Sequence, residues 1–524
     1  MKCCTFLIIA VALLGSAECS KILLVFPFAA PSHYILGSTL AKGLAESGHN
    51  ITMVSAFGER TPPQNLTYRD IVLTGFLEER KKRNMNLFKL EDLDPYSYTT
   101  FLLSMCLENT RKTFEHPNFQ ALINSDEEFD AVIVEVFFNE ALYGLASHFN
   151  APLILFSSTG PSLYIDMAIG NPSPPSYIPE IILKYSSDMT FWQRVMNWSF
   201  KVIAQLYYYY INLPAHNRIM KQHLPHIPDL SVINYNASII LLNSHESFSQ
   251  PIPHVPNMID IGGFHVTPVD HLPWDVKNFM DGAKDGVVYF SMGSAIKPTD
   301  MPEDKRDAIV KALGKIKQRV LWKWNEDNII GKPDNVKLFK WLPQQDILAH
   351  PNTKLFITHG GLLSTIETLH HGVPILSFPI FGDQKANSAR AEMDGYGITI
   401  PFPEITEKKL TAALKELLNK KKYRKNAKRR SKLMRDRPVQ SLDLARYWVE
   451  YVIRHGGTPH LRVAGVDLPW YKYLLLDVIL FVVLASVGSI TTIYVVMRRL
   501  CRRQVAKKQT EKKQTEKKKK VKKN

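Results

Sequence analysis

Short apolar runs alternate with longer amphipathic stretches through most of the chain. From residue 21 the runs are KILLVFPF, ITMVSAF, FDAVIVEVF, PLILFS and ASIILLNS, and from residue 286 they are GVVYFS, RVLWKW, VKLFKW, KLFITH, PILSFP and GITIPF. Runs that are apolar on both faces and separated by helix-length segments are typical of a parallel sheet covered by helices. The pattern therefore predicts an α/β protein with two such units. Because ligands bind at the carboxyl ends of parallel strands, the two units would face a common cleft.

The segment between the two series, TPVDHLPWDVKNFMDGAKD, carries two prolines and has no sustained hydrophobic period. This composition indicates a linker over residues 267–285. We therefore expect a first domain over residues 20–266 and a second over residues 286–455. A juxtamembrane segment over residues 456–473 would follow the second domain.

Apolar segments of another kind lie at both ends of the chain. Residues 1–19 have a lysine, an apolar run and then small residues, which is the layout of a secretory signal peptide with cleavage near Cys19. Residues 478–496 contain no charged side chain and are long enough to cross a bilayer core of ~30 Å. We predict a transmembrane helix over residues 474–497, with the basic residues 498–524 on the cytoplasmic side. The chain would then be a single-pass type I membrane protein.

The net charge of +16 is concentrated in the tail. Residues 498–524 hold 14 Lys or Arg and 2 Glu, which gives +12 and leaves the rest of the chain nearly balanced. Since the tail is predicted to lie across the membrane from the body, no nucleic-acid partner is expected. Lys520 and Lys522 resemble a retrieval signal of the endoplasmic reticulum, and a disordered polybasic tail at anionic lipid is a compatible alternative. The body is expected in the lumen of that compartment.

Two further features concern a lumenal body. Asn-x-Ser/Thr sequons occur at Asn50, Asn65, Asn197 and Asn236, and the last three are the candidate glycosylation sites because Asn50 opens a predicted strand. Cys106 is the only thiol that is expected to be lumenal in the mature chain, so no disulfide framework is predicted.

The segment 191–211, FWQRVMNWSFKVIAQLYYYYI, is aromatic-rich and apolar at nearly helical spacing. Three interpretations stay open for it: the wall of an apolar acceptor pocket, a contact with the membrane surface, or an ordinary packed helix.

Several common site motifs are absent from the sequence. No Gly-x-Gly-x-x-Gly follows a strand, and there is no Walker loop and no His-Glu-x-x-His. The usual nicotinamide, nucleoside triphosphatase and zinc protease functions are therefore not indicated. Asp92 and Asp94 have the spacing that some transferases use for a divalent cation, but they lie in a charged stretch that is typical of a solvated loop, and no metal is expected.

The stretch FITHGGLLSTIETLHHGVPILSFPIFGDQ predicts a strand, a glycine turn, a helix and a second strand. Gly360 and Gly361 would give the turn its positive-φ freedom, and the following helix would direct its amide groups and positive dipole end at the turn. Such a turn is an anion site suited to a diphosphate, where His359 can donate to a phosphate oxygen. Glu367 can accept from a ribose hydroxyl, and Asp383 with Gln384 can bind sugar hydroxyls.

This stretch resembles the signature of the UDP-glycosyltransferase family, and the resemblance extends over essentially the mature chain. It implies a GT-B fold, in which two Rossmann-like parallel-sheet domains face a cleft, with one C-terminal transmembrane helix in the membrane-bound animal members. The second domain would hold the UDP-sugar, which is a co-substrate, so no cofactor is implied. In WLPQQDILAHP the resemblance assigns Trp341 to stacking on uracil and Gln344 to the nucleotide. The other donor-binding positions that it implies are Ser291, Gly293 and Ser294 in FSMGS, and Ser364 in the signature.

On the acceptor side, PFAAPSHYI places His33 just beyond the first strand, where the family has its general base. A histidine is chemically suited to take the proton of a phenol or alcohol. The family orients this histidine with an Asp, and FDAVIVEVFFNE places Glu135 at that position instead. Asp130 and Glu140 are the alternative candidates.

The resemblance implies an inverting transfer of a hexose or glucuronic acid to a hydroxyl of small lipophilic acceptors, in detoxification or hormone conjugation. Glucose and glucuronate stay open as donor sugars. Glucose is preferred because the amino-acid sequences of several motifs are similar to those of invertebrate members, which usually use UDP-glucose. A non-catalytic sugar-nucleotide-binding membrane protein is the alternative, supported by the glutamate at position 135. The oligomeric state is open, and a homo-oligomer is one of the alternatives.

Overall fold

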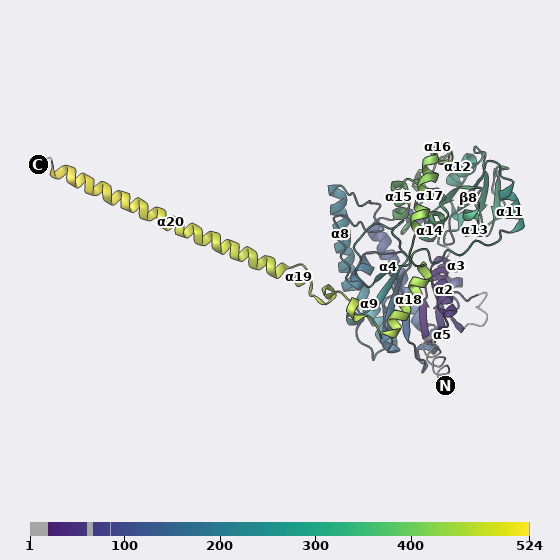
Figure 1. Cartoon of the computed structure of the whole chain (residues 1–524), viewed down its shortest axis with the longest axis horizontal. Helices are drawn as coiled ribbons and strands as arrows, with labels where there is room; N and C mark the ends of the chain where they lie inside the picture. The colour runs from purple at the N-terminus through teal and green to yellow at the C-terminus, as the bar shows by residue number, and fades with distance from the viewer. Residues whose placement is uncertain (1–18, 60–66, 84, 523–524) are drawn as a thin grey trace, which may run out of the picture. The chain divides into compact units, whose positions relative to one another are not determined.

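The computed structural model describes residues 19–59, 67–83 and 85–522. The predicted signal peptide, apart from its last residue, and the sequon at Asn65 lie outside the described residues. Residues up to Arg462 form one compact unit, and residues from Val463 onward form a second (Figure 1).

The first sheet contains seven parallel strands within the described residues, in the order β3-β2-β1-β4-β5-β6-β7. Its inner strands are buried on both faces, which is why they are continuous apolar runs in the sequence. The strands are β1 (Lys21–Phe26), β2 (Asn50–Ser55), β3 (Tyr68–Val72), β4 (Ala131–Glu135), β5 (Leu153–Ser157), β6 (Ile239–Leu242) and β7 (Met258–Asp260). The helices of this part are α2 (Pro31–Glu46), α3 (Phe76–Arg83), α4 (Pro95–Glu115), α5 (Pro117–Ile123), α6 (Gly144–His148), α7 (Leu163–Ile169), α8 (Phe191–Tyr207), α9 (Leu213–His223) and α10 (Leu230–Ile233).

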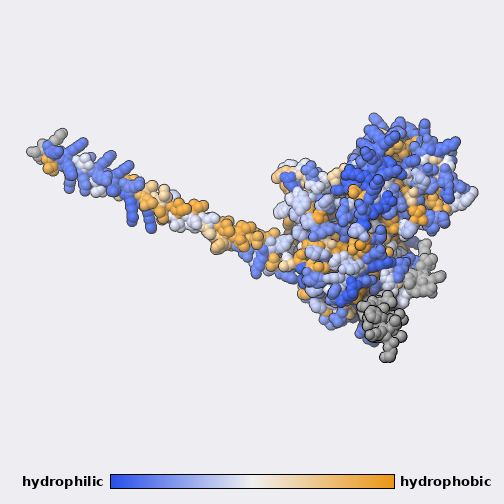
Figure 2. All heavy atoms as spheres, in the orientation of Figure 1, coloured by the Kyte–Doolittle hydropathy of each residue, from blue (hydrophilic) through white to orange (hydrophobic). Residues whose placement is uncertain are grey.

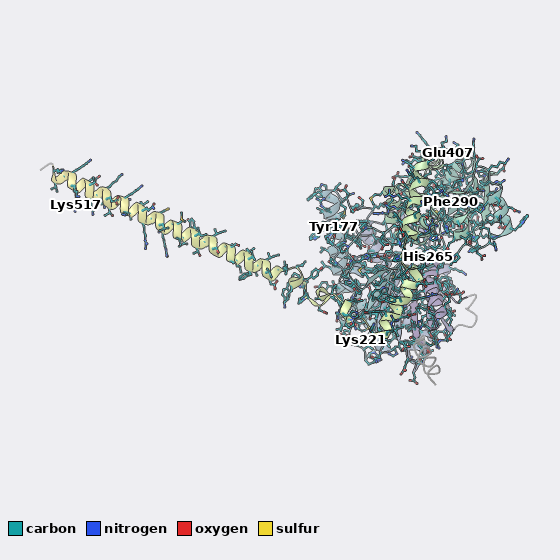
Figure 3. All side chains as sticks on the ribbon, in the orientation of Figure 1. Tyr177, Lys221, His265, Phe290, Glu407 and Lys517 are labelled. Atoms are coloured by element: carbon teal, nitrogen blue, oxygen red, sulfur yellow. The ribbon has the colours of Figure 1, made fainter. Side chains whose placement is uncertain are left out.

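The second sheet has six parallel strands across the fully described residues 286–455, in the order β10-β9-β8-β11-β12-β13. Its core includes Phe290, which Figure 3 labels. Phe290 stacks on Trp322 with 4.6 Å between ring centroids. The strands are β8 (Val287–Ser291), β9 (Arg319–Lys323), β10 (Val336–Phe339), β11 (Thr353–Thr358), β12 (Ile375–Ser377) and β13 (Gly397–Thr399). The helices are α11 (Trp274–Asp281), α12 (Glu303–Leu313), α13 (Gln344–Ala349), α14 (Leu362–His371), α15 (Gln384–Met393), α16 (Glu407–Asn419) and α17 (Lys421–Arg435).

The two sheets share one topology, and this determines where a ligand can bind. In each sheet the strand order reverses at one point, between β1 and β4 in the first sheet and between β8 and β11 in the second. Chain segments that leave neighbouring strands in opposite directions at such a point open a crevice at the carboxyl ends of the strands. The prediction of two parallel-sheet α/β units is confirmed.

The segment 267–285 is more ordered than a linker. Its residues 274–281 form α11, and Val276 and Met280 are buried in the core of the second sheet. The backbone N–H groups of Thr267 and Asp270 donate to the side chains of Gln345 and Asp346, so the start of the segment is also attached to the second sheet. The predicted linker is corrected, because two apolar residues four positions apart suffice to pack so short a helix.

Helix α18 (Ser441–Arg454) lies in the predicted second domain but packs on the first sheet. Ala445, Val449 and Val452 are fully buried in the core that the first sheet forms with α2. Arg446 donates to Gly43 O at 2.8 Å and pairs with Glu46 at 2.9 Å. The boundary at residue 455 is therefore corrected, since the chain returns to the first domain after α17.

The candidate glycosylation site Asn197 is also corrected. It lies inside α8 and is fully buried, with its Nδ2 group donating to two backbone carbonyl oxygens and its Oδ1 accepting from Glu180 N. A glycan needs its amide in solvent, so this side chain has a structural role instead. Asn236 is exposed.

The second unit, described by itself, contains α19 (Trp470–Tyr473) and α20 (Leu476–Val521). Among the described residues, α20 is the one helix that is long and apolar enough to cross a membrane. Figure 2 shows its apolar first part and its hydrophilic continuation. The helix continues to Val521, so the basic tail is helical rather than disordered; its Lys, Arg, Glu and Gln residues are good helix formers.

Candidate active site

A cavity of about 1670 Å³ lies at the carboxyl ends of both sheets. Its wall includes His33 after β1 and Ser158 after β5 in the first sheet. From the second sheet it includes Ser291 at the end of β8 and Gly361 after β11. Both points of strand reversal therefore open into the same space.

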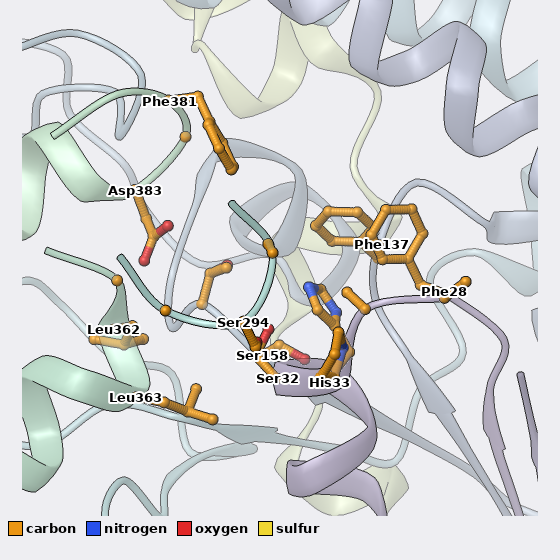
Figure 4. A pocket seen from close by; sticks show the side chains of 18 of the residues that line it. Phe28, Ser32, His33, Phe137, Ser158, Ser294, Leu362, Leu363, Phe381 and Asp383 are labelled. Atoms are coloured by element: carbon orange, nitrogen blue, oxygen red, sulfur yellow. The ribbon is translucent and has the colours of Figure 1, made fainter. Parts of the chain in front are cut away.

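His33 and Glu135 meet at the reversal point of the first sheet. After β1 and the four residues 27–30, α2 begins at Pro31, which places His33 in the first turn of the helix. Glu135 is the last residue of the neighbouring β4. The imidazole Nδ1 lies 2.5 Å from Glu135 Oε1. Two aromatic rings fix the imidazole further, Phe28 at 5.1 Å and Phe137 at 4.6 Å between centroids (Figure 4).

Glu135 is fully buried, and the side-chain hydrogen bonds of its carboxylate are made through one oxygen atom, Oε1. Ser158 donates its hydroxyl to the same Oε1 atom that contacts His33. Within the described residues Oε2 has no hydrogen-bond partner. The glutamate thus reaches the histidine despite its additional methylene.

The alternative carboxylates do not approach His33 in this way. Asp130 lies before β4, at the opposite end of the strand, and accepts from Lys21 N at 2.7 Å. Glu140 lines the cavity, but its Oε2 contacts Asn212 at 3.3 Å and His216 at 3.4 Å.

In the second sheet, the glycine turn after β11 surrounds the imidazole of His359. Gly360 has a φ of +81°, as expected, whereas Gly361 is the N-cap of α14 with a φ of −62°. The prediction of positive φ at Gly361 is wrong, and glycine is needed there for another reason. A Cβ on Gly361 would lie 2.5 Å from His359 Nε2, and one on Gly293 would lie 2.5 Å from its Cε1.

His359 is an uncharged donor in this environment. Burial, with a smaller contribution from the positive charge of Lys323, lowers the pKa of His359 to about 4. The imidazole is therefore neutral near pH 7 and can give one N–H to a ligand.

Gln344, Ser364 and Glu367 form a hydrogen-bonded group on the cavity wall. Gln344 Nε2 donates to Ser364 Oγ at 3.0 Å and to Glu367 Oε2 at 2.6 Å. Burial raises the pKa of Glu367 to about 7, against the opposing hydrogen bonds from Gln344 and Gln345. Trp341 lies at the same wall with 69% of its surface exposed, which leaves its ring available to a planar base.

Asp383 and Gln384 lie after β12 at the end of the second sheet. Asn387 donates to Asp383 Oδ2 at 2.7 Å, and burial raises the pKa of this carboxyl. Figure 4 shows Asp383 and His33 on opposite sides of the pocket. Gln384 accepts two backbone N–H groups through Oε1, and its Nε2 donates to none of the described residues.

The structure adds polar cavity residues that the sequence analysis did not select. Lys323 at the end of β9 donates to Gly293 O at 3.0 Å, and burial lowers its pKa. Arg80 on α3 donates to Ala29 O at 2.6 Å and lines the same cavity. A basic residue at a strand end was the available signal for Lys323.

The part of the wall that the first domain supplies carries two more buried acids. Glu140 and Glu180 both line the cavity, and burial raises the pKa of each to about 7. Tyr164 lies on the same wall, and its hydroxyl has no hydrogen-bond partner in the part of the chain that the structure describes.

No group of three or more His, Cys, Asp or Glu side chains in the described ranges could hold a metal ion. Asp94 instead caps α4 by accepting from Tyr96 N and Ser97 N.

Comparison with known proteins identifies the family. The family model described as UDP-glucoronosyl and UDP-glucosyl transferase matches residues 21–513. The chain belongs to this family. The UDP-glycosyltransferase UGT5 of Dactylopius coccus is 38% identical over 493 residues, which are 92% of this chain and 93% of that protein. The human UDP-glucuronosyltransferase 1A8 is 35% identical over 496 residues, which are 91% of each chain.

Solved structures show the same fold as this UDP-glycosyltransferase. The UDP-glucose: anthocyanidin 3-O-glucosyltransferase in complex with UDP has a TM-score of 0.56 at 18% identity, and the match covers 83% of this chain and 99% of that one. The GT-B fold is confirmed.

Proposed function

We propose that this UDP-glycosyltransferase transfers a hexose or glucuronic acid, with inversion, to a hydroxyl of small lipophilic acceptors. The observation that carries this proposal is the pair His33 and Glu135, which faces the glycine turn of the second sheet across one cavity. An acceptor and a nucleotide sugar bound in this cavity would bring hydroxyl and sugar together.

His33 acts as the general base. An ionised carboxylate only accepts hydrogen bonds, so the proton between His33 and Glu135 belongs to Nδ1, and Nε2 keeps its lone pair. Nε2 takes the acceptor proton while the acceptor oxygen bonds to the sugar C1 and the bond from C1 to the diphosphate oxygen breaks. The buried Glu135 stabilises the imidazolium that forms.

The second sheet binds the donor. The N-terminus of α14, His359 and the nearby Lys323 stabilise the charge that develops on the diphosphate. Trp341 stacks on the base, Gln344 contacts the nucleotide, and Glu367 accepts from the ribose hydroxyls. Ser291, Gly293, Ser294 and Ser364 contribute to diphosphate binding, and Asp383 with Gln384 binds the sugar.

The first domain binds the acceptor in the wider part of the cavity. Phe28, Phe137 and Phe138 supply apolar wall near His33. The non-catalytic alternative depended on the glutamate at position 135, and it loses that support because Glu135 reaches the imidazole.

The cellular setting follows from the ends of the chain. We infer a type I protein of the endoplasmic reticulum membrane with a cleaved signal peptide, a lumenal body and a cytoplasmic tail after α20. A membrane location suits acceptors that partition into lipid, and their conjugation makes them water-soluble in detoxification or hormone inactivation.

Product analysis tests the proposal and names the donor. Membranes that carry the protein are given equal UDP-glucose and UDP-glucuronate with a simple phenol, and the conjugate is weighed by mass spectrometry. We expect a product heavier by one hexose, since UDP-glucosyltransferase 2 of Dactylopius coccus is among the relatives, at 35% identity. A hexuronate product would reverse the donor preference, and no conjugate despite UDP binding would contradict catalysis by His33.

A further inference from the structure

The first domain has an apolar surface that no described part of the body covers. It runs along α8 and the π-helical turn Tyr208–Asn212 that follows it. Trp192 and Tyr210 expose 75% and 77% of their surface at its two ends. We call this the α8 surface, and define it by Trp192, Met196, Trp198, Ile203, Leu206 and Tyr210, all of them exposed.

The α8 surface is largely apolar because two polar residues of the helix are turned inward. Asn197 and Lys201 are buried, and Lys201 Nζ donates to Ser173 Oγ at 2.8 Å. Arg194, the other charged residue in the segment 191–211, is exposed near the start of the helix and donates to Met189 O at 2.8 Å. A water-exposed helix normally shows the opposite arrangement, with its polar side chains outward.

The surface lies near the point where the chain leaves the body. Tyr235 donates its hydroxyl to Tyr209 at 2.9 Å, and three residues later Ser238 O accepts a hydrogen bond from Thr458. The compact first unit ends four residues beyond Thr458, at Arg462. One end of the α8 surface is therefore connected through two hydrogen bonds to the exit of the chain.

The segment that follows the first unit is short. Residues 463–475 separate Arg462 from the helix α20, and an extended chain of that length reaches at most about 45 Å. If α20 crosses a bilayer, the exit point stays within that distance of the lipid.

We infer that the α8 surface lies in the interfacial layer of the bilayer that α20 crosses. The inference rests on the proposed membrane span. Trp and Tyr side chains are enriched at this depth, where an apolar ring meets a hydrated headgroup. A helix that presents an apolar face with Trp, Phe or Leu side chains can lie in the plane of the interface, with that face toward the acyl chains.

This position would bring the lipid close to the acceptor part of the cavity. The α8 residue Phe200 packs on Tyr96 of α4 with 5.2 Å between ring centroids. The next residues of α4, among them Tyr98, Phe101 and Leu102, line the cavity. A lipophilic acceptor dissolved in the bilayer would then enter next to the wall that binds it.

Quenching in lipid nanodiscs tests the inference with the full chain. The exposed native cysteine of the mature chain is removed as Cys501→Ser, while Cys106 is buried. A fluorophore is attached at Tyr210→Cys, and a matched control at Trp274→Cys, which replaces a tryptophan with 79% exposure on α11. We expect nitroxide lipids to quench the label at 210 at least twofold more than the label at 274, and aqueous iodide to show the reverse order.

Two results would overturn the inference. Iodide quenching at 210 equal to that at 274 would place the α8 surface in water. Protection from both quenchers, together with cross-linking between copies, would show that a second copy of the chain covers it. A repeat at Ile203→Cys excludes an effect of the label at one position.

Transfer kinetics give a second measurement that separates this inference from the proposed function. In the variant with Trp192→Glu and Ile203→Glu, we expect KM for a bilayer-partitioned phenol to rise at least threefold, with kcat for a water-soluble phenol unchanged. Equal KM values for the variant and the unmodified chain would contradict the entry route. If the unmodified chain transfers sugar to neither phenol, the proposed function fails, and the quenching result still decides where the α8 surface lies.

Discussion

His33 and Glu135 are 102 positions apart in the chain, and a single hydrogen bond joins them across two strand ends. The resemblance to the family predicted both residues, and the apolar runs place them near the ends of two predicted strands. It could not predict that Ser158 completes the group, since a serine after a strand has no distinguishing local signal. Lys323 was missed for a similar reason, because a lysine at a strand end normally reaches solvent.

A double-mutant cycle tests whether His33 and Glu135 act as a unit. We expect His33→Ala to lower kcat by about 10³-fold, the range of general base catalysis. Glu135→Gln should lower it less, and the double variant should be no slower than His33→Ala, because Glu135 acts only through the imidazole. Additive losses in steady-state assays would show that Glu135 has a separate role. UDP binding, measured by calorimetry, should be the same in all three.

The pKa of Glu367 predicts how donor binding depends on pH. Burial raises this pKa to about 7, so the free protein carries a proton there at pH 6. Ribose hydroxyls donate to the ionised form, and binding at pH 6 must therefore first release the proton. We expect UDP-glucose to bind about tenfold more weakly at pH 6 than at pH 8. Calorimetry on Glu367→Gln should give weaker binding that no longer changes over this range.

At the scale of elements, the turn between β11 and α14 shows what a motif can and cannot reveal. The two glycines predicted a turn at an anion site, and the turn is there. Glycine is needed at the two positions for different reasons. Gly360 has a positive φ, whereas Gly361 leaves room for the His359 ring. Such a close approach depends on where a neighbouring side chain lies, which the local sequence does not encode.

Substituting Gly361 separates these two reasons. In Gly361→Ala the backbone conformation is allowed, but the new Cβ must displace the His359 ring, which lies 2.5 Å away. We expect at least a hundredfold loss of UDP affinity with a melting temperature within a few degrees of the unmodified chain. The matched control is Gly488→Ala in α20, where a Cβ meets no atom within 4 Å. Normal UDP binding by Gly361→Ala would contradict the role of this turn.

For the whole molecule, the sequence predicted two α/β units but assigned α18 to the wrong one. The apolar period of α18 predicts a helix with one buried face, and nothing local shows which sheet buries it. Long-range packing of this kind is determined by the tertiary fold. The short helix α11 was assigned to a linker because two buried residues do not make a detectable period.

A buried charge in α18 tests how much the first sheet depends on this helix. Val449 is fully buried against the first sheet, whereas Tyr447 is half exposed on the same helix. We expect Val449→Asp to destabilise the protein by at least about 3 kcal/mol, and Tyr447→Asp by less than about 1 kcal/mol. Thermal unfolding of the full chain in detergent measures both. Similar melting temperatures for the two variants would show that α18 adds little to the first domain.

The return of α18 to the first sheet has a consequence for synthesis on the ribosome. The strands of the first sheet are complete at Asp260, but Ala445, Val449 and Val452, which close one face of its core, emerge nearly two hundred residues later. At translation rates of about 5–20 residues per second, that face stays exposed for roughly 10–40 s before α18 is synthesised. During this interval the nascent chain presents an apolar sheet face that a chaperone can bind, and a message truncated before codon 441 would leave it permanently open.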